Sequence, residues 1–143
     1  MAPANAKAAH VVVEKKLKEL EKFSNETELN YIEWNDKKIG VISAGVAYQY
    51  AKEVFGKDAS YLKLGFTFPL PMEKIKKFAE EVETLYVVEE LEPFMEEQIK
   101  AAGIKCIGKE KIPNIWELNP DIVKKSIFGT ENEIIDYDRT IAV

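Results

Sequence analysis

The sequence is poor in the residues that build metal centres and disulfide frameworks. Its 143 residues include one cysteine, Cys106, and one histidine, His10. A single cysteine cannot form an intramolecular disulfide, and one residue of each kind cannot supply the ligands of a zinc site or an iron–sulfur cluster. We therefore expect no metal site and no bound cofactor in this chain.

Long apolar runs and an excess of positive charge are also missing. No stretch is long enough to cross a bilayer, and no apolar signal segment follows Met1. The net charge is −5, and Arg139 is the only arginine among the 20 basic residues. An acidic surface of this kind disfavours nucleic acid and anionic membranes as partners. Together with the lone cysteine, these absences predict a cytoplasmic protein.

The pattern around which the chain is organised runs over residues 39–56. It opens on Ile39, Val41 and Ile42, a short apolar run typical of a strand that is buried on both faces. From Gly45 onwards, apolar residues recur at three- and four-residue spacing, which predicts a helix. A strand, a tight turn and a helix form the first half of a βαβ unit. Ligands or partners meet such folds at the carboxyl ends of the strands.

Similar units follow along the chain and predict one α/β domain over residues 1–143. Its core is expected over residues 29–128 and an irregular tail over 129–143. The strand that precedes the central one is joined to it by only a short turn, so it must run antiparallel to the others. We expect a three-layer αβα sandwich on a five-stranded, mostly parallel sheet. The expected elements are a helix over 5–23, strands near 29–34, 39–42, 61–66, 85–88 and 104–107, and helices that begin at Pro71, Pro93 and Pro120.

The carboxyl ends of the predicted strands bring together the candidate functional residues. We expect Ser43, Gly45, Tyr48, Phe66 and Glu89 to gather there, as a cleft or a protein interface. Aromatic residues at such an edge suit a protein interface better than proton transfer. The alternative, that the rings pack inward, is equally consistent with the pattern.

Two chemical interpretations of this edge remain open from the residues alone. The turn over residues 43–45 could present backbone N–H groups to an anion, although a glycine that only permits a tight strand-to-helix turn explains it more simply. Glu89 and Glu90 follow a strand, where adjacent side chains point to opposite faces, so they do not form a catalytic pair. Either could face a cleft or lie in solvent. We assign no catalytic, cofactor-binding or metal-binding residue.

Three stretches go beyond a generic α/β pattern: residues 40–50, 62–71 and 87–99. In this order and spacing they resemble the middle domain of the alpha subunit of indolepyruvate:ferredoxin oxidoreductase. Residues 2–7 and the helix after them are similar to the segment that leads into that domain. The resemblance covers roughly residues 2–128.

The resemblance implies a fold like the C-terminal domain of transketolase. It also implies a parent enzyme that oxidatively decarboxylates aryl pyruvates, such as indolepyruvate, to aryl-acetyl-CoA with ferredoxin as electron acceptor. The implied cofactors of the parent are thiamine diphosphate, Mg²⁺ and [4Fe–4S] clusters. The implied partners are other domains of the same subunit, a beta subunit, ferredoxin and CoA.

The motifs that would hold those cofactors are absent from this sequence. It has neither the Gly-Asp-Gly motif for magnesium diphosphate nor the Cys-x-x-Cys-x-x-Cys motifs for clusters. We therefore expect the chain to be one domain of a longer subunit, with a structural or assembly role, and to be inactive in isolation. The alternative is a free-standing α/β domain that binds a small ligand or a partner.

Overall fold

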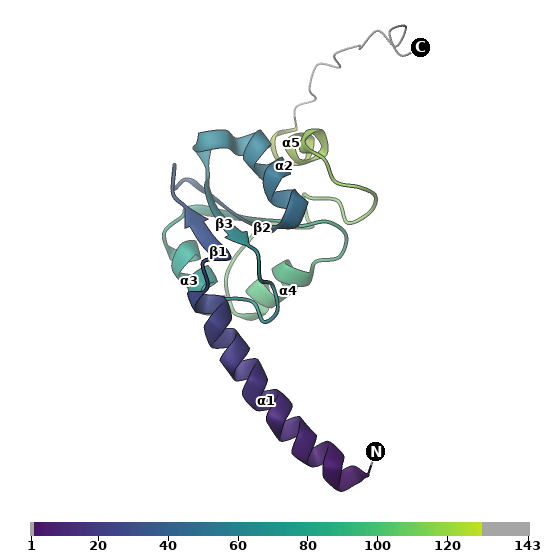
Figure 1. Ribbon diagram of the computed structural model, residues 1–143. Coiled ribbons are helices and arrows are strands. Elements are labelled where there is room, and N and C mark those ends of the chain that lie inside the picture. Colours follow the sequence, from purple (N-terminus) through teal and green to yellow (C-terminus); the bar gives the residue numbers. More distant parts are fainter. Residues whose placement is uncertain (1, 130–143) are drawn as a thin grey trace, which may run out of the picture.

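A computed structural model describes residues 2–129 of the chain, so most of the predicted tail lies outside the described residues. An α/β body carries one long helix that projects away from it (Figure 1). None of the helices in residues 2–129 combines the length and apolar character needed to span a bilayer.

The sheet of the described residues has four strands: β1 (Asn30–Glu33), β2 (Ile39–Ala44), β3 (Ser60–Leu64) and β4 (Thr84–Val88). Their order is β1-β3-β2-β4. The strand β2 is central and runs parallel to β3 and β4, whereas β1 runs antiparallel to β3. The antiparallel orientation of β1 was predicted from the sequence. The sequence did not decide whether β1 pairs with β2 or with another strand, and the structure places it beside β3.

Helices cover both faces of the sheet, as the αβα prediction requires. The helices α2 and α5 belong to one apolar core, and α3 and α4 belong to the other. Strand residues alternate between these cores, because successive side chains point to opposite faces. Val41 joins the α2 side and Ile42 the α3 side, and both are fully buried. The helices of the described residues are α1 (Pro3–Glu26), α2 (Gly45–Phe55), α3 (Met72–Glu80), α4 (Phe94–Ala101) and α5 (Pro120–Phe128).

The predicted fifth strand over residues 104–107 is wrong. Ile107 forms a single parallel bridge with Tyr86 and exchanges two backbone hydrogen bonds of 2.8 Å with the neighbouring residues of β4. The chain then turns at Gly108, where a side chain would collide with Glu96: a Cβ atom at Gly108 would lie 2.2 Å from a Glu96 carboxylate oxygen. In the described residues this segment pairs with β4 through one bridge only.

A buried amide fastens the base of α1 to the sheet. The Nδ2 atom of Asn30 donates to the backbone oxygens of Ser24 and Phe66, at 3.0 and 2.9 Å. Its Oδ1 atom accepts from the backbone nitrogens of Gly65 and Phe66, at 2.9 and 2.8 Å. Asn30 is fully buried. One side chain thus joins the end of α1, strand β1 and the loop that follows β3.

Gly45 lies at the junction of β2 and α2 with φ +56°, a left-handed conformation that side chains with a Cβ atom disfavour. No heavy atom lies within 4 Å of the position that a Cβ atom would take. We therefore expect Gly45→Val to lower the free energy of unfolding by about 1–3 kcal/mol through backbone strain alone. Urea denaturation would measure this. Because asparagine tolerates left-handed backbone, Gly45→Asn should cost clearly less, and equal losses in both variants would contradict the explanation.

Candidate functional site

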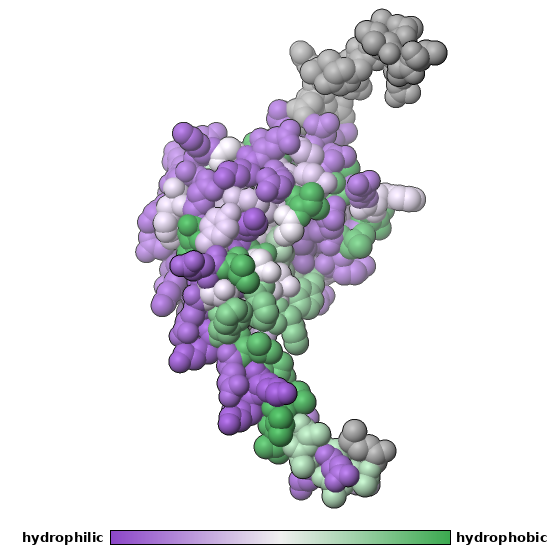
Figure 2. All heavy atoms as spheres, viewed as in Figure 1, coloured by the Kyte–Doolittle hydropathy of each residue, from purple (hydrophilic) through white to green (hydrophobic). Residues whose placement is uncertain are grey.

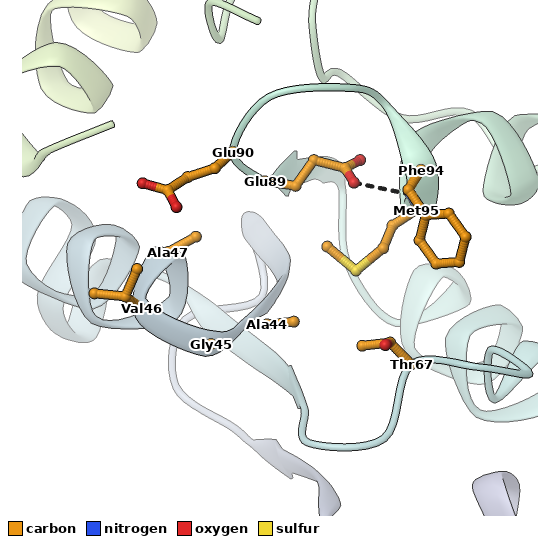
Figure 3. A pocket seen from close by; sticks show the side chains of 9 residues that line it. All are labelled: Ala44, Gly45, Val46, Ala47, Thr67, Glu89, Glu90, Phe94 and Met95. Atoms are coloured by element: carbon orange, nitrogen blue, oxygen red, sulfur yellow. Dashed lines mark hydrogen bonds between the residues drawn. The ribbon is translucent and has the colours of Figure 1, made fainter. Parts of the chain in front are cut away.

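A hollow of about 300 Å³ opens at the carboxyl ends of the parallel strands. It lies between the beginnings of α2 and α4, each of which starts close to the end of a strand (Figure 3). Most of its lining is apolar, and two carboxylates border it. The lining residues are Ala44, Gly45, Val46, Ala47, Thr67, Glu89, Glu90, Phe94 and Met95.

The carboxylate of Glu89 caps the beginning of α4. One of its oxygens accepts from the backbone nitrogen of Met95 and the other from that of Glu96, both at 2.9 Å. These two N–H groups belong to the first turn of α4, which has no partner for them within the helix. A negative charge at this end of a helix also interacts favourably with the helix dipole. Glu89 is 7% exposed, so the capped end is closed from solvent.

Further charged groups, those of Lys109, Glu96 and Lys100, hold this arrangement in place. The Nζ atom of Lys109 donates to the backbone oxygen of Glu89. Glu96 accepts from the Nζ atom of Lys100 at 2.6 Å and from the backbone nitrogen of Lys109 at 2.7 Å. The close approach of Glu96 to Gly108 is possible only because residue 108 has no side chain. The chain around Gly108 is therefore tied to the same end of α4.

The two buried glutamates have shifted pKa values of opposite sign. Burial raises the pKa of Glu89, and the N–H donors of Met95 and Glu96 offset this only in part. Burial also raises the pKa of Glu96, but the hydrogen bonds from Lys100 and Lys109 outweigh it and hold its pKa below the ordinary value. Burial lowers the pKa of Lys109.

The two carboxylates at the hollow have different partners. Both oxygens of Glu89 accept hydrogen bonds from backbone donors, which hold its carboxylate against the beginning of α4. Glu90 accepts from the backbone nitrogen of Leu118 at 3.3 Å, and its carboxylate points toward the first turn of α2 (Figure 3). An anion at that helix end would meet the negative charge of Glu90, which disfavours an anion site there.

The structure brings two of the five predicted site residues together, and places the other three elsewhere. Gly45 and Glu89 line the hollow. Tyr48 is 3% exposed and packs edge-to-face on Tyr61. The Ser43 hydroxyl is fully buried and has no hydrogen-bond partner in the described residues. Phe66 packs against Phe23 of α1, with ring centroids 5.3 Å apart. A functional role of these five residues stays a prediction.

Sequence reasoning missed a set of exposed apolar residues beyond the strand ends, of which Val46 and Phe94 line the hollow. We define the carboxyl-edge rim as Val46, Phe68, Leu91 and Phe94, which are 48%, 62%, 59% and 47% exposed. Val46 follows β2, Phe68 follows β3, and the other two follow β4. Leu91 also has φ 56°, an unfavourable backbone conformation for leucine that displays its side chain. A signal was present in the sequence: each residue is a large apolar side chain a few positions beyond a strand.

The described residues do not fit the cofactors that the resemblance implies for the parent enzyme. No group of three or more histidine, cysteine, aspartate or glutamate side chains in this part of the chain is placed to hold a metal ion. Burial raises the pKa of the Cys106 thiol to about 11, so it is poor in the thiolate form that binds iron.

The opposite pKa shifts of Glu89 and Glu96 give a pH test of the cap. Folding raises the pKa of Glu89 above 4.5, so its contribution to stability is complete below that pH and is lost as the pH rises through the raised value. Folding lowers the pKa of Glu96, so its contribution is present above 4.5 and is lost as the pH falls.

We therefore compare Glu89→Gln with Glu96→Gln by urea denaturation between about pH 3 and pH 7. The excess stability of the wild type over Glu89→Gln should decrease as the pH rises. Its excess stability over Glu96→Gln should increase over the same range. The same sign of pH dependence in both comparisons would contradict the assignment of the two environments.

Comparison with known proteins places the chain in a family. Residues 30–134 match the family model described as the indolepyruvate oxidoreductase domain. The chain is 35% identical to indolepyruvate oxidoreductase subunit IorA of Thermococcus kodakarensis over 127 residues, which is 81% of this chain and 20% of the relative. It is also 35% identical to the IorA subunit of Methanothermobacter thermautotrophicus over 140 residues, which is 89% of this chain and 23% of the relative.

A solved structure shares the fold. It is a 2-oxoglutarate:ferredoxin oxidoreductase from Magnetococcus marinus, described with 2-oxoglutarate, coenzyme A and succinyl-CoA bound. The TM-score is 0.64 at 16% identity, over 90% of this chain and 23% of the solved chain. This chain thus spans about a fifth of the length of the relatives it matches. It belongs to the indolepyruvate oxidoreductase domain family and is similar to one domain of the IorA subunit.

Proposed function

We propose that this chain is an assembly domain of an enzyme that oxidatively decarboxylates aryl pyruvates, with ferredoxin as electron acceptor and an aryl-acetyl-CoA as product. The family membership supports the parent activity. The observation that carries the assembly role is the carboxyl-edge rim, four large apolar side chains that stay exposed beyond the strand ends, two of which, Val46 and Phe94, line the hollow. Exposed apolar residues gathered in this way are typical of a protein contact.

The buried polar groups beside the rim support an assembly role rather than a catalytic one. The hydrogen bonds of three buried or half-buried side chains hold α4 and the chain around Gly108 in place; these are the side chains of Glu89, Glu96 and Lys109. They fix the loop that displays Leu91 and Phe94. In this proposal the hollow accepts an apolar side chain of the neighbouring domain.

The cofactors of the parent enzyme belong, in this proposal, to other domains. Thiamine diphosphate, Mg²⁺ and [4Fe–4S] clusters would be held by the rest of the alpha subunit and by a beta subunit, which are also the proposed partners. Ferredoxin and CoA would bind the assembled enzyme. The proposed fold relative is the C-terminal domain of transketolase. The proposed compartment is the cytoplasm, since a buried free thiol suits a reducing environment.

A free-standing domain that binds a small ligand or a partner is the second candidate. The observation in its favour is the hollow itself, whose volume of about 300 Å³ is at the lower limit for a small-molecule site. Its apolar walls and two carboxylates would favour a ligand with an apolar body and a cationic group.

The cofactor part of the proposal predicts that the chain does not bind thiamine diphosphate. The reason is that neither its sequence nor its described side chains supply a magnesium–diphosphate site. Calorimetric titration with thiamine diphosphate and Mg²⁺ should give no saturable heat. The same titration of the IorA subunit of Thermococcus kodakarensis serves as the comparison. Saturable micromolar binding to this chain would contradict the proposal.

The assembly part predicts the effect of polar substitutions in the carboxyl-edge rim. Residues 2–129 would replace the matching domain of the Thermococcus kodakarensis subunit, and the hybrid would be produced with its partner subunit. We expect Leu91→Ser and Phe94→Ser to weaken association by about tenfold or more, because each removes buried apolar area from the contact. Turnover of indolepyruvate per assembled enzyme should stay unchanged.

The control is Trp34→Ser near the opposite edge of the sheet; Trp34 is 43% exposed but also packs on Phe78, with ring centroids 5.3 Å apart, so any loss of stability in this variant shows what disturbed packing alone does to association. Light scattering reports the assembly and ferredoxin reduction reports the turnover. If the rim variants assemble normally but no longer turn over indolepyruvate, the rim belongs to the active site and the assembly role is wrong. Unaltered association and turnover in both rim variants would also overturn it.

A further inference from the structure

The carboxylate of Glu90 has few partners within the described chain. Glu90 follows β4, is half-buried and borders the hollow. In residues 2–129 its carboxylate accepts a single hydrogen bond, of 3.3 Å, from the backbone nitrogen of Leu118. None of the ion pairs formed by these residues includes it. An ionised carboxylate has about four acceptor sites, so most of the capacity of Glu90 is left to solvent or to another molecule.

The charge beside the carboxyl-edge rim is mainly of one sign, although the surface of the whole molecule is mixed (Figure 2). Residues 89–97 contain five glutamates and neither lysine nor arginine. Lys109 lies near them, but its Nζ atom donates to the backbone oxygens of Glu89 and Pro113. Three of the glutamates form no ion pair within the part of the chain that the structure describes: Glu90, Glu92 and Glu97. A surface that is apolar at its centre and negative beside it is complementary to a partner with a positive group at the matching place.

A partner that covers the rim also covers Glu90. Val46 and Phe94 of the rim line the same hollow as Glu90, so a protein that buries these side chains removes water from the carboxylate. A carboxylate that is buried without a counter-ion weakens association, whereas a positive group within hydrogen-bonding distance offsets the lost hydration. Lysine and arginine also have long apolar stems, which suit the apolar walls of the hollow.

We propose that the protein surface covering the carboxyl-edge rim brings a lysine or arginine side chain to Glu90, beside the apolar side chain that enters the hollow. This pairing rests on the proposed function and adds the chemistry of the partner to it. Figure 3 shows Glu90 and Phe94 apart from each other at the hollow, so the basic and the apolar side chain have separate places. An uncharged partner surface would instead leave Glu90 buried without a counter-ion, and the two cases differ in the effect of removing its charge.

The substitution Glu90→Gln in the hybrid subunit removes the charge and keeps an oxygen that accepts from the backbone of Leu118. We expect the dissociation constant for the partner subunit, measured by calorimetric titration, to rise about tenfold or more, because the cation of the partner loses its counter-ion. Against an uncharged surface the same substitution would lower the constant, since no charge is then desolvated. The control is Glu83→Gln, which should leave the constant unchanged. Glu83 is an exposed glutamate directly before β4, at the opposite end of the same strand.

Salt gives a second readout of the same pair. High salt should weaken association of the wild type more than that of Glu90→Gln, because only the wild type has this ion pair to screen. A constant that is unchanged or lowered in Glu90→Gln, while Leu91→Ser still weakens association, would overturn the pairing of Glu90 and leave the assembly role standing. Equal weakening by Glu90→Gln and Glu83→Gln would also overturn the pairing. If Leu91→Ser and Phe94→Ser both leave association unaltered, the proposed function fails and the pairing fails with it.

Discussion

The central strand β2 cannot face water on either side, and the rest of the body is built to satisfy this constraint. Val41 and Ile42 point to opposite faces, and both are fully buried. One layer of helices would leave one of them exposed, so α2 with α5 and α3 with α4 must cover both faces. The parallel neighbours β3 and β4 satisfy the backbone of β2 on both edges. The loops at the carboxyl ends of these strands are then brought to one edge.

A polar group near this edge connects the sheet to one of the helices that cover it. Glu89 follows the last residue of β4 and caps α4, so one carboxylate joins a strand end to the helix that covers it. An ionisable group in such a closed position is often part of an active site. Here its partners are backbone donors of its own fold, and the exposed neighbours are apolar. The buried polar groups here are hydrogen-bonded within the fold, whereas the exposed side chains beside them are apolar, and this contrast supports the proposed contact surface.

Helix α1 differs from the other helices of the described residues in how little of it is buried. The helices α2 to α5 each bury residues against the sheet or its covering layers, whereas α1 buries only Ser24 near its end. Asn30 donates to the backbone oxygen of Ser24 in α1 and makes three more hydrogen bonds with the backbone of Gly65 and Phe66, so it ties the base of the helix to the loop after β3. Helix α1 is thus attached to the body at its base, while most of its length stays outside the core.

The sequence by itself determined the elements and their layers, because these depend on local periodicity. The run at Val41 and Ile42 predicted the doubly buried strand, and Asn119 caps α5 as its residue type predicts. Only the tertiary structure decided which side chains meet. In the folded protein Tyr48 is buried and Leu91 is exposed. Glu89 accepts a hydrogen bond from the backbone of α4. The predicted fifth strand is reduced to a single bridge at Ile107. Burial and hydrogen bonding of these groups depend on residues distant in the sequence, such as Tyr61 beside Tyr48 and Glu96 beside Gly108, and no local pattern encodes them.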